Sequence, residues 1–209
     1  MPKPKVVVLD AMGVIYLAGD DVAELLIPFA RSRGCRLPDS DIAETYMEAS
    51  LGQLTSTDLW RSLGVAGPSA DLDADYLKGH KLTPGVRQFL GKMKAAEIPV
   101  ACISNDVAEW SRALRKAHGL EDLIFQWTIS GEVGARKPDA AIFQRFRSAT
   151  ELWFEDCVFV DDNARNLDAA RALGFRTLLF GRPKTPDGAS QHVLALSFEE
   201  LEAWLLAEP

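Results

Sequence analysis

The 209-residue chain is 47% hydrophobic and 25% charged, which is typical of a globular protein and unlike a disordered or collagen-like chain. Its length suits one substantial core with room for a smaller accessory domain. The formal net charge of -7 offers no electrostatic footprint for nucleic acid or an anionic membrane surface, so an anionic substrate needs local positive charge.

Cysteines, histidines and apolar stretches indicate the cellular setting. The three cysteines are far apart and form no C-x-x-C pair, and the three histidines show no metal-ligand spacing, so we expect reduced thiols and no zinc site. The longest apolar stretch, residues 6–18, contains Asp10 and is shorter than the roughly 20 residues that span a bilayer. We therefore expect a cytoplasmic protein that has neither a membrane nor a nucleic acid as its partner. The oligomeric state is left open.

Apolar runs predict a sheet. Val6–Leu9 is a continuous apolar run rich in β-branched residues, as in strands buried on both faces, and Asp10 ends it. Comparable runs, separated by helical patterns, follow at residues 98–103, 125–129, 157–160 and 177–180. This alternation predicts an α/β fold, in which helices cover both faces of a parallel sheet.

The segment after the first strand has a different pattern. No strand-like run occurs between about Tyr16 and Leu82, and the stretch is far longer than an ordinary connection. It is typical of short helices, which we predict at residues 22–33, 41–50, 57–63 and 72–78. We interpret this segment as a helical subdomain inserted after the first strand.

Several helix boundaries carry capping signals. Thr83 followed by Pro84 predicts an N-cap with proline at the first helical position. Asn163 is predicted to cap a helix that ends before Gly174, and Ser197 with Glu200 predicts the start of a C-terminal helix. Residues 181–190 are predicted to form a loop.

Polar residues follow the predicted strands where these strands end. Asp10 ends the first run, Ser104-Asn105-Asp106 the second and Asp161-Asp162-Asn163 the fourth, while Lys137 follows the third after a short loop. The carboxyl ends of parallel strands share one edge of a sheet, so these groups are expected to converge. Adjacent carboxylates repel one another unless a cation compensates them, which favours a hard divalent ion such as Mg²⁺.

These residues resemble a known family. Val-Val-Val-Leu-Asp10-Ala-Met-Gly, Ile-Ser104-Asn-Asp, Arg-Lys137-Pro-Asp and Phe-Val-Asp161-Asp162-Asn are similar, in order and spacing, to the four motifs of the haloacid dehalogenase-like (HAD) hydrolase superfamily. The resemblance covers nearly the whole chain. It implies a Rossmann-like core of residues 1–15 and 83–209, with residues 16–82 as a helical cap.

The resemblance also implies catalytic roles. Asp10 matches the nucleophile that forms an aspartyl intermediate, and Lys137 matches the cation that positions it and neutralises the gathered charge. Ser104 matches the hydroxyl that binds phosphoryl oxygens, with the neighbouring Asn105 and Lys137 completing the phosphate-binding group. A small phosphorylated molecule is the implied substrate.

The same resemblance implies a Mg²⁺ site. Asp162 resembles the direct metal ligand, and Asp161 resembles its neighbour in the metal shell. Asp10 contributes a further carboxylate. The backbone carbonyl of Met12 is the remaining implied ligand, a role that needs no particular side chain.

Met12 departs from the family pattern. Phosphatases of the family carry a second Asp at this position, which protonates the leaving alkoxide and then activates water, whereas a thioether transfers no proton. General acid–base catalysis commonly contributes about 10²–10⁴ in rate. Asp20 and Asp21 offer a replacement acid, although two Asp residues before a helix are more often an N-terminal cap. Arg31, Arg33 and Arg36 offer a basic cluster for a substrate anion, although a solvated helix end is the more ordinary interpretation.

Three functions remain open from the sequence. The first is Mg²⁺-dependent hydrolysis of phosphates that have a good leaving group, or with an acid supplied by the cap. The second is dehalogenation, in which halide leaves unprotonated, but Asp161-Asp162 differs from the Ser/Asn-type motif of metal-independent dehalogenases. The third is a catalytically weakened protein kept for binding or regulation. Phosphonatase-like chemistry requires a cap lysine, and the segment offers only Lys78 and Lys81 at its return end.

Overall fold

The fold is built on one parallel sheet. The computed structural model describes residues 5–181 and 192–207. Its six-stranded sheet has the order β3-β2-β1-β4-β5-β6, and every pairing is parallel. The strands are β1 (Val6–Leu9), β2 (Val100–Ser104), β3 (Gln126–Ile129), β4 (Cys157–Asp161), β5 (Arg176–Phe180) and β6 (Val193–Ala195). The predicted α/β class is thereby confirmed.

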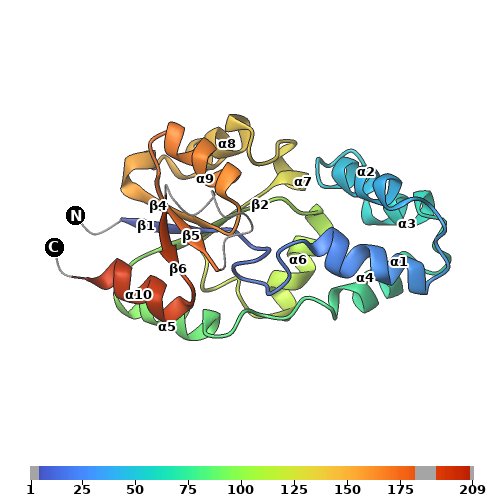
Figure 1. The fold of residues 1–209 in the computed structure, drawn as a ribbon, viewed down its shortest axis with the longest axis horizontal. Coiled ribbons are helices and arrows are strands. Elements are labelled where there is room, and N and C mark those ends of the chain that lie inside the picture. The colour runs from blue at the N-terminus through green and yellow to red at the C-terminus, as the bar shows by residue number, and fades with distance from the viewer. Residues whose placement is uncertain (1–4, 182–191, 208–209) are drawn as a thin grey trace.

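Helices cover both faces of the sheet, as Figure 1 shows. Val7 and Leu9 of β1 face the cluster that contains α5 (Val86–Ala95), α6 (Ala108–Ala117) and α10 (Phe198–Leu206). Val6 and Val8 face the cluster that contains α8 (Ala140–Thr150) and α9 (Ala164–Ala172). Successive residues of a strand point to opposite faces of the sheet. A strand that helices cover on both faces is therefore apolar at every position, as β1 is.

The residues between β1 and α5 form a helical segment, defined here as residues 22–77. It contains η1 (Val22–Leu26), α1 (Ile27–Ser32), α2 (Asp39–Ala49), α3 (Ser56–Ser62) and α4 (Ser69–Leu77). These helices bury an apolar cluster of their own, in which Trp60 and Tyr76 contact Trp110 of α6. The segment lies beyond the carboxyl ends of the strands (Figure 1).

Two short helices lie next to strands of the sheet. α7 (Ser130–Val133) follows β3 directly, and η2 (Phe154–Asp156) leads into β4. In the described part of the chain, the structure has no helix with both the length and the apolar character that a membrane crossing requires.

Most predicted boundaries agree with the structure within a few residues. Asn163 caps α9 through Arg165 N, and Ser197 caps α10 through Glu200 N. Thr83 is not the cap of α5: that helix begins at Val86 behind Gly85. Thr83 N donates instead to Ile15 O, so this residue is held against the chain that leaves β1. The predicted loop at 181–190 lies outside the described residues except for Gly181.

Candidate active site

The strand register brings the polar strand ends together. Leu9 of β1 is level with Cys102 of β2 on one side and with Val160 of β4 on the other. Asp10 therefore emerges beside the ends of both neighbouring strands, one of which ends at Asp161. The central position of β1 in the sheet gives Asp10 a neighbouring strand on both sides.

Lys137 links the strand ends through its ammonium group. Lys137 Nζ lies 2.6 Å from Asp10 Oδ1 and 2.8 Å from Asp161 Oδ2. It also donates to the backbone carbonyl of Ile103 at 3.0 Å. All three side chains are buried, so the ammonium satisfies two carboxylates that have little contact with solvent.

The carboxylates strongly affect one another. Burial, together with the charges of Asp161 and Asp162, holds the pKa of Asp10 well above its usual range, while Lys137 acts in the opposite direction. Burial alone lowers the pKa of Lys137, but its contacts with Asp10 and Asp161 outweigh burial and raise that pKa. Lys137 is therefore a permanent positive charge, and the three carboxylates still outnumber it.

The three carboxylates have the geometry of a cation site. Asp10, Asp161 and Asp162 each offer an oxygen, and these oxygens lie within 4.8 Å of one another. Gly13 has a positive φ of 78°, and a Cβ there would lie 2.2 Å from Asp162 Oδ2. The glycine thus leaves the space that the Asp162 carboxylate fills. An excess of carboxylate oxygens around one point suits a hard cation such as Mg²⁺, so the residues present fit the predicted metal.

The backbone and α9 hold Asp161 in place. Its Oδ1 accepts from Asn163 N at 2.8 Å, and Asn166 Nδ2 lies 3.0 Å from Oδ2 and 3.2 Å from Oδ1. Asn166 follows Asp161 by five residues, within the first turn of α9. Asn166 is absent from the site predicted from the sequence, although an amide one helical turn after the acidic pair is a usable signal.

The two residues at the end of β2 have different surroundings. Asn105 lines the cavity described below, and its side chain exchanges two hydrogen bonds with the backbone of Lys137, at 2.8 and 3.0 Å. Ser104 is fully buried, and its hydroxyl has no hydrogen-bond partner among the described residues. Asn105 thus fixes the Lys137 loop. The phosphate-binding role of both residues stays a prediction.

A cavity of about 460 Å³ opens between the sheet edge and the helical segment. The sheet edge supplies Asp10, Met12, Lys137 and Asp162, and the helical segment supplies apolar groups such as Ile27. Arg136 and Tyr46 also line it, with the guanidinium 5.8 Å from the tyrosine ring centre. Neither residue belongs to the site predicted from the sequence, because nothing in the local pattern shows that α2 packs beside the Lys137 loop.

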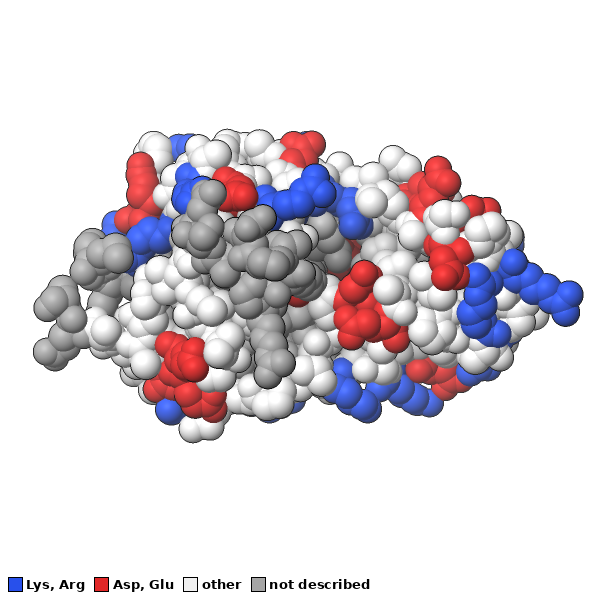
Figure 2. All heavy atoms as spheres, viewed as in Figure 1, with Lys and Arg blue, Asp and Glu red and all other residues white. Residues whose placement is uncertain are grey.

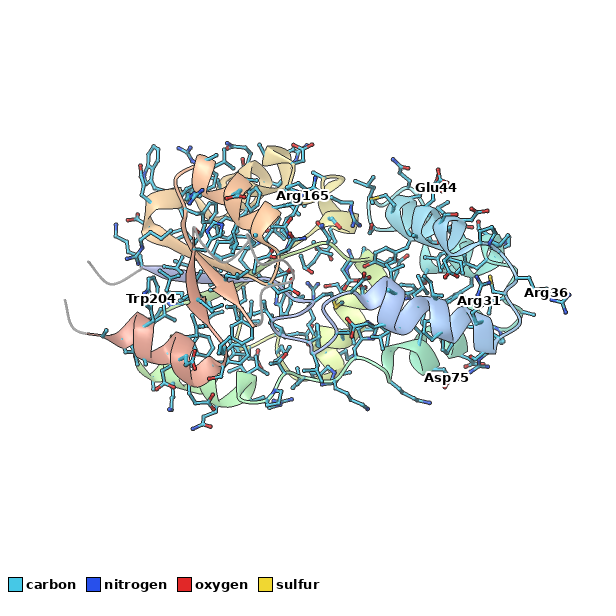
Figure 3. The ribbon with its side chains drawn as sticks, viewed as in Figure 1. Arg31, Arg36, Glu44, Asp75, Arg165 and Trp204 are labelled. Carbon is cyan, nitrogen blue, oxygen red and sulfur yellow. The ribbon has the colours of Figure 1, made fainter. Side chains whose placement is uncertain are left out.

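Positive charge for an anion is found inside the cavity. Figure 2 shows acidic side chains gathered on the viewed face where the core meets the helical segment. Arg31 and Arg36 lie at the far end of the helical segment, and Arg36 points away from the rest of the molecule (Figure 3). Arg31 and Arg33 pair instead with Asp39 and Asp75, at 2.5 and 2.6 Å. The arginine cluster is thus a solvated helix end.

Comparison with known proteins decides the family. Residues 4–174 match the family model described as haloacid dehalogenase-like hydrolase. The chain belongs to this family of hydrolases. In this HAD-like hydrolase, Asp10 and Asp161-Asp162 follow or end the strands β1 and β4, and Lys137 lies in the loop between α7 and α8.

Individual relatives are similar at low identity. The chain is 25% identical over 213 residues to a phosphoserine phosphatase of Streptomyces coelicolor, covering 90% of this chain and 50% of that protein. It is 31% identical over 163 residues to (S)-2-haloacid dehalogenase 1 of Pseudomonas sp., covering 75% of this chain and 66% of that protein. The chain therefore spans between half and two thirds of the length of these relatives.

A solved structure shares the fold. A HAD family enzyme from Bacteroides thetaiotaomicron, crystallised with magnesium and inorganic phosphate, superimposes with a TM-score of 0.71 at 18% identity. The match covers 87% of this chain and 96% of that one. At this identity the likeness shows the fold alone.

Proposed function

We propose that this HAD-like hydrolase cleaves small phosphate monoesters with the help of Mg²⁺, through a phosphoryl group carried on Asp10. The observation that carries the proposal is the set of three carboxylates within 4.8 Å, two of which contact Lys137 in a cavity. Such a site attracts a cation and, through that cation and Lys137, a phosphate dianion. The similarity to a phosphoserine phosphatase supports the same chemistry.

Asp10, Asp161 and Asp162 are the side chains that would hold the metal, with the Met12 carbonyl as a further ligand. Bound Mg²⁺ supplies charge neutralisation for the transferring phosphoryl group. Lys137 supports the same function from the protein side, since its ammonium lies 2.6 Å from the Asp10 carboxylate and favours the ionised form of that group. Ala11 N donates to Asp10 Oδ1 at 2.6 Å, which fixes the orientation of the nucleophile.

The remaining polar groups position the substrate. Asn105 and Arg136 line the cavity with Lys137 and offer N–H donors to phosphoryl oxygens. Asp10 then attacks the phosphorus as the bond to the leaving oxygen breaks. Water attacks the resulting aspartyl phosphate in a second step, which releases inorganic phosphate and regenerates Asp10. The helical segment, which belongs to the proposed cap of residues 16–82, shields these steps from bulk solvent.

The first test uses p-nitrophenyl phosphate, whose leaving group needs little protonation. We expect turnover with Mg²⁺, loss of turnover in EDTA, and loss of at least 10³-fold in Asp10→Asn, because an amide is no nucleophile. Mg²⁺ should also raise the melting temperature of the wild-type protein, because a cation bound only by the folded state stabilises it by mass action. Absence of metal-dependent turnover across aryl and alkyl phosphates would contradict the proposal.

Dehalogenation is the second candidate. The 31% identity to a haloacid dehalogenase favours it, and so does Met12, because halide leaves without a proton. The crowded carboxylates count against it, since a reaction that needs no metal gains nothing from three neighbouring negative charges. Chloride release from 2-chloropropionate in EDTA would support this candidate over phosphate hydrolysis.

A further inference from the structure

The proposed reaction lacks a proton donor at residue 12. Met12 lines the cavity near Asp10, but a thioether carries no acidic proton. Lys137 is held charged between two carboxylates, and the guanidinium of Arg136 does not give up its proton in proteins. Among the described residues that line the cavity, the carboxyl groups outside the metal cluster are Asp20 and Asp21.

These two neighbouring carboxylates have different environments. Asp20 is exposed, its Oδ1 accepts from Ala23 N at 3.0 Å, and its own N–H donates to Glu24 Oε1 at 2.8 Å. This reciprocal pattern resembles a capping box, with the Glu one residue later, and it satisfies backbone N–H groups at the start of η1. Asp21 makes no side-chain cap hydrogen bond, and it is buried with 8% of its surface exposed. Helix capping therefore accounts for Asp20 but leaves Asp21 without a local structural role.

Asp21 is held toward the cavity by the helical segment. Tyr46 of α2, itself buried, donates its hydroxyl to Asp21 Oδ2 at 2.8 Å. The charged groups that act on Asp21 are Asp20 beside it, Asp106 after β2 and Arg136 of the Lys137 loop. Asp21 is thus a buried carboxyl group in the wall of the cavity, and the hydroxyl of Tyr46 orients it through Oδ2.

We propose that Asp21 is the general acid and base of this hydrolase, in place of the carboxylate that is absent at residue 12. The role rests on the proposed phosphate hydrolysis. As the bond between phosphorus and the leaving oxygen breaks and Asp10 bonds to phosphorus, the Asp21 carboxyl gives its proton to that oxygen and an alcohol leaves. In the second step the Asp21 carboxylate takes a proton from water, whose oxygen bonds to phosphorus as the bond to Asp10 breaks.

The protonation of Asp21 suits this role. Burial, with a contribution from Asp20, raises the pKa of Asp21 to about 6, although Tyr46 and Arg136 act in the opposite direction. A group that titrates near neutral pH is able both to give and to take a proton within one turnover.

The test compares two substrates that differ in their need for a proton. The phenol released from phenyl phosphate is a much weaker acid than p-nitrophenol, so its departure depends more on protonation. We expect Asp21→Asn to lower kcat/KM for phenyl phosphate by about 10²-fold and for p-nitrophenyl phosphate by no more than a few fold. The control is Asp71→Asn, an exposed carboxylate of α4, which should leave both rates unchanged.

Each other outcome overturns the assignment. An equal loss on both substrates would make Asp21 a structural residue, and an equal retention would give it no role. A wild-type enzyme that hydrolyses only p-nitrophenyl phosphate would show that it has no acid. A wild-type enzyme that hydrolyses neither would instead refute the proposed function, which distinguishes the two failures.

Tyr46→Phe adds a second measurement, the pH dependence of kcat/KM, which would not change if Asp21 had only a structural role. The lost hydrogen bond favoured the carboxylate, so its removal raises the pKa of Asp21. We expect the high-pH limb of kcat/KM for phenyl phosphate to move to higher pH in Tyr46→Phe and to disappear in Asp21→Asn. Because the substrate titrates identically in all assays, a limb that stays in place in both variants would contradict the proposal.

Discussion

At the scale of single residues, the site combines buried charged side chains that compensate one another. Asp10 and Asp161 are buried carboxylates, and each would be strongly destabilising without a partner. Lys137 contacts both, and Asn105 fixes the backbone of Lys137 in turn. The position of the ammonium is therefore fixed by its carboxylate partners and by the Lys137 backbone. Its charge favours the ionised form of Asp10, against burial and the neighbouring carboxylates, which raise the pKa of Asp10.

Met12→Asp tests whether the missing proton donor at residue 12 limits the rate of hydrolysis. A carboxyl at residue 12 should raise hydrolysis of alkyl and phenyl phosphates, because it stands next to the nucleophile in the same cavity. The rise should be about 10²-fold in the Asp21→Asn background and smaller in the wild type, since either acid would serve the same proton. Steady-state rates of the four proteins on phenyl phosphate measure this coupling.

The variant is informative only if its metal site is intact. Retained Mg²⁺-dependent hydrolysis of p-nitrophenyl phosphate by Met12→Asp is the control for that. With this activity present, an unchanged rate on phenyl phosphate in the Asp21→Asn background would contradict the prediction.

At the scale of elements, Asp73 joins the helical segment to the core. Its Oδ1 accepts from the indole N–H groups of Trp60 at 2.7 Å and Trp110 at 2.6 Å. Trp60 belongs to α3 and Trp110 to α6, and both are buried. One carboxylate of α4 thus satisfies donors from both sides of this junction.

Asp73→Ala should therefore be strongly destabilising. Two buried indole N–H groups lose their acceptor, and we expect the free energy of unfolding to fall by about 2–4 kcal/mol. Denaturant unfolding measures the change. Asp71→Ala, an exposed carboxylate two residues earlier on the same helix, is the control and should change stability by about 0.5 kcal/mol or less. Equal effects of the two substitutions would contradict this account.

The elements also show what the sequence allowed us to predict. The proximity of the strand ends that carry Asp10 and Asp161 was predictable, because parallel register brings carboxyl ends to one edge. The cap at Thr83 was wrong, since its N–H pairs with Ile15 and the turn at Gly85, with φ of 85°, starts the helix. The three-residue strand β6 is too short for a periodic signal. Asp21 and Tyr46 meet only after α2 folds against η1, a tertiary contact that no local pattern encodes.

At the scale of the whole molecule, the chain passes twice between the sheet and the helical segment, once on leaving β1 and once on returning to α5. Leu17 N donates to Lys81 O at 2.9 Å, and Tyr16 forms isolated bridges with Met12 and Leu82. The division into a core of 1–15 and 83–209 and a cap of 16–82, which stays a prediction, falls at these crossings. Asp21 lies four residues beyond Leu17, so the proposed acid would be carried by the cap while the nucleophile belongs to the core.

Asp21 should lower the stability of the folded protein at neutral pH. Its pKa of about 6 in the folded state exceeds the ordinary value near 3.9, so folding favours the protonated form. The stability that this preference provides is fully present below about pH 4 and is lost as the pH rises through about 6. At pH 8 the protein therefore holds a buried ionised carboxylate, which Asp21→Asn removes.

We expect Asp21→Asn to be more stable than the wild type at pH 8, relative to the same comparison at pH 4, by about 2–3 kcal/mol. Urea unfolding of both proteins across this range in saturating Mg²⁺ measures the difference, and the other titrating groups cancel because both proteins contain them. Asp71→Asn should show no such trend, because its carboxylate is exposed. A difference between Asp21→Asn and wild type that stays constant with pH would mean that Asp21 titrates as it does in the unfolded chain. The ionised form of Asp21 would then cost the folded protein no stability, and its burial would not raise its pKa.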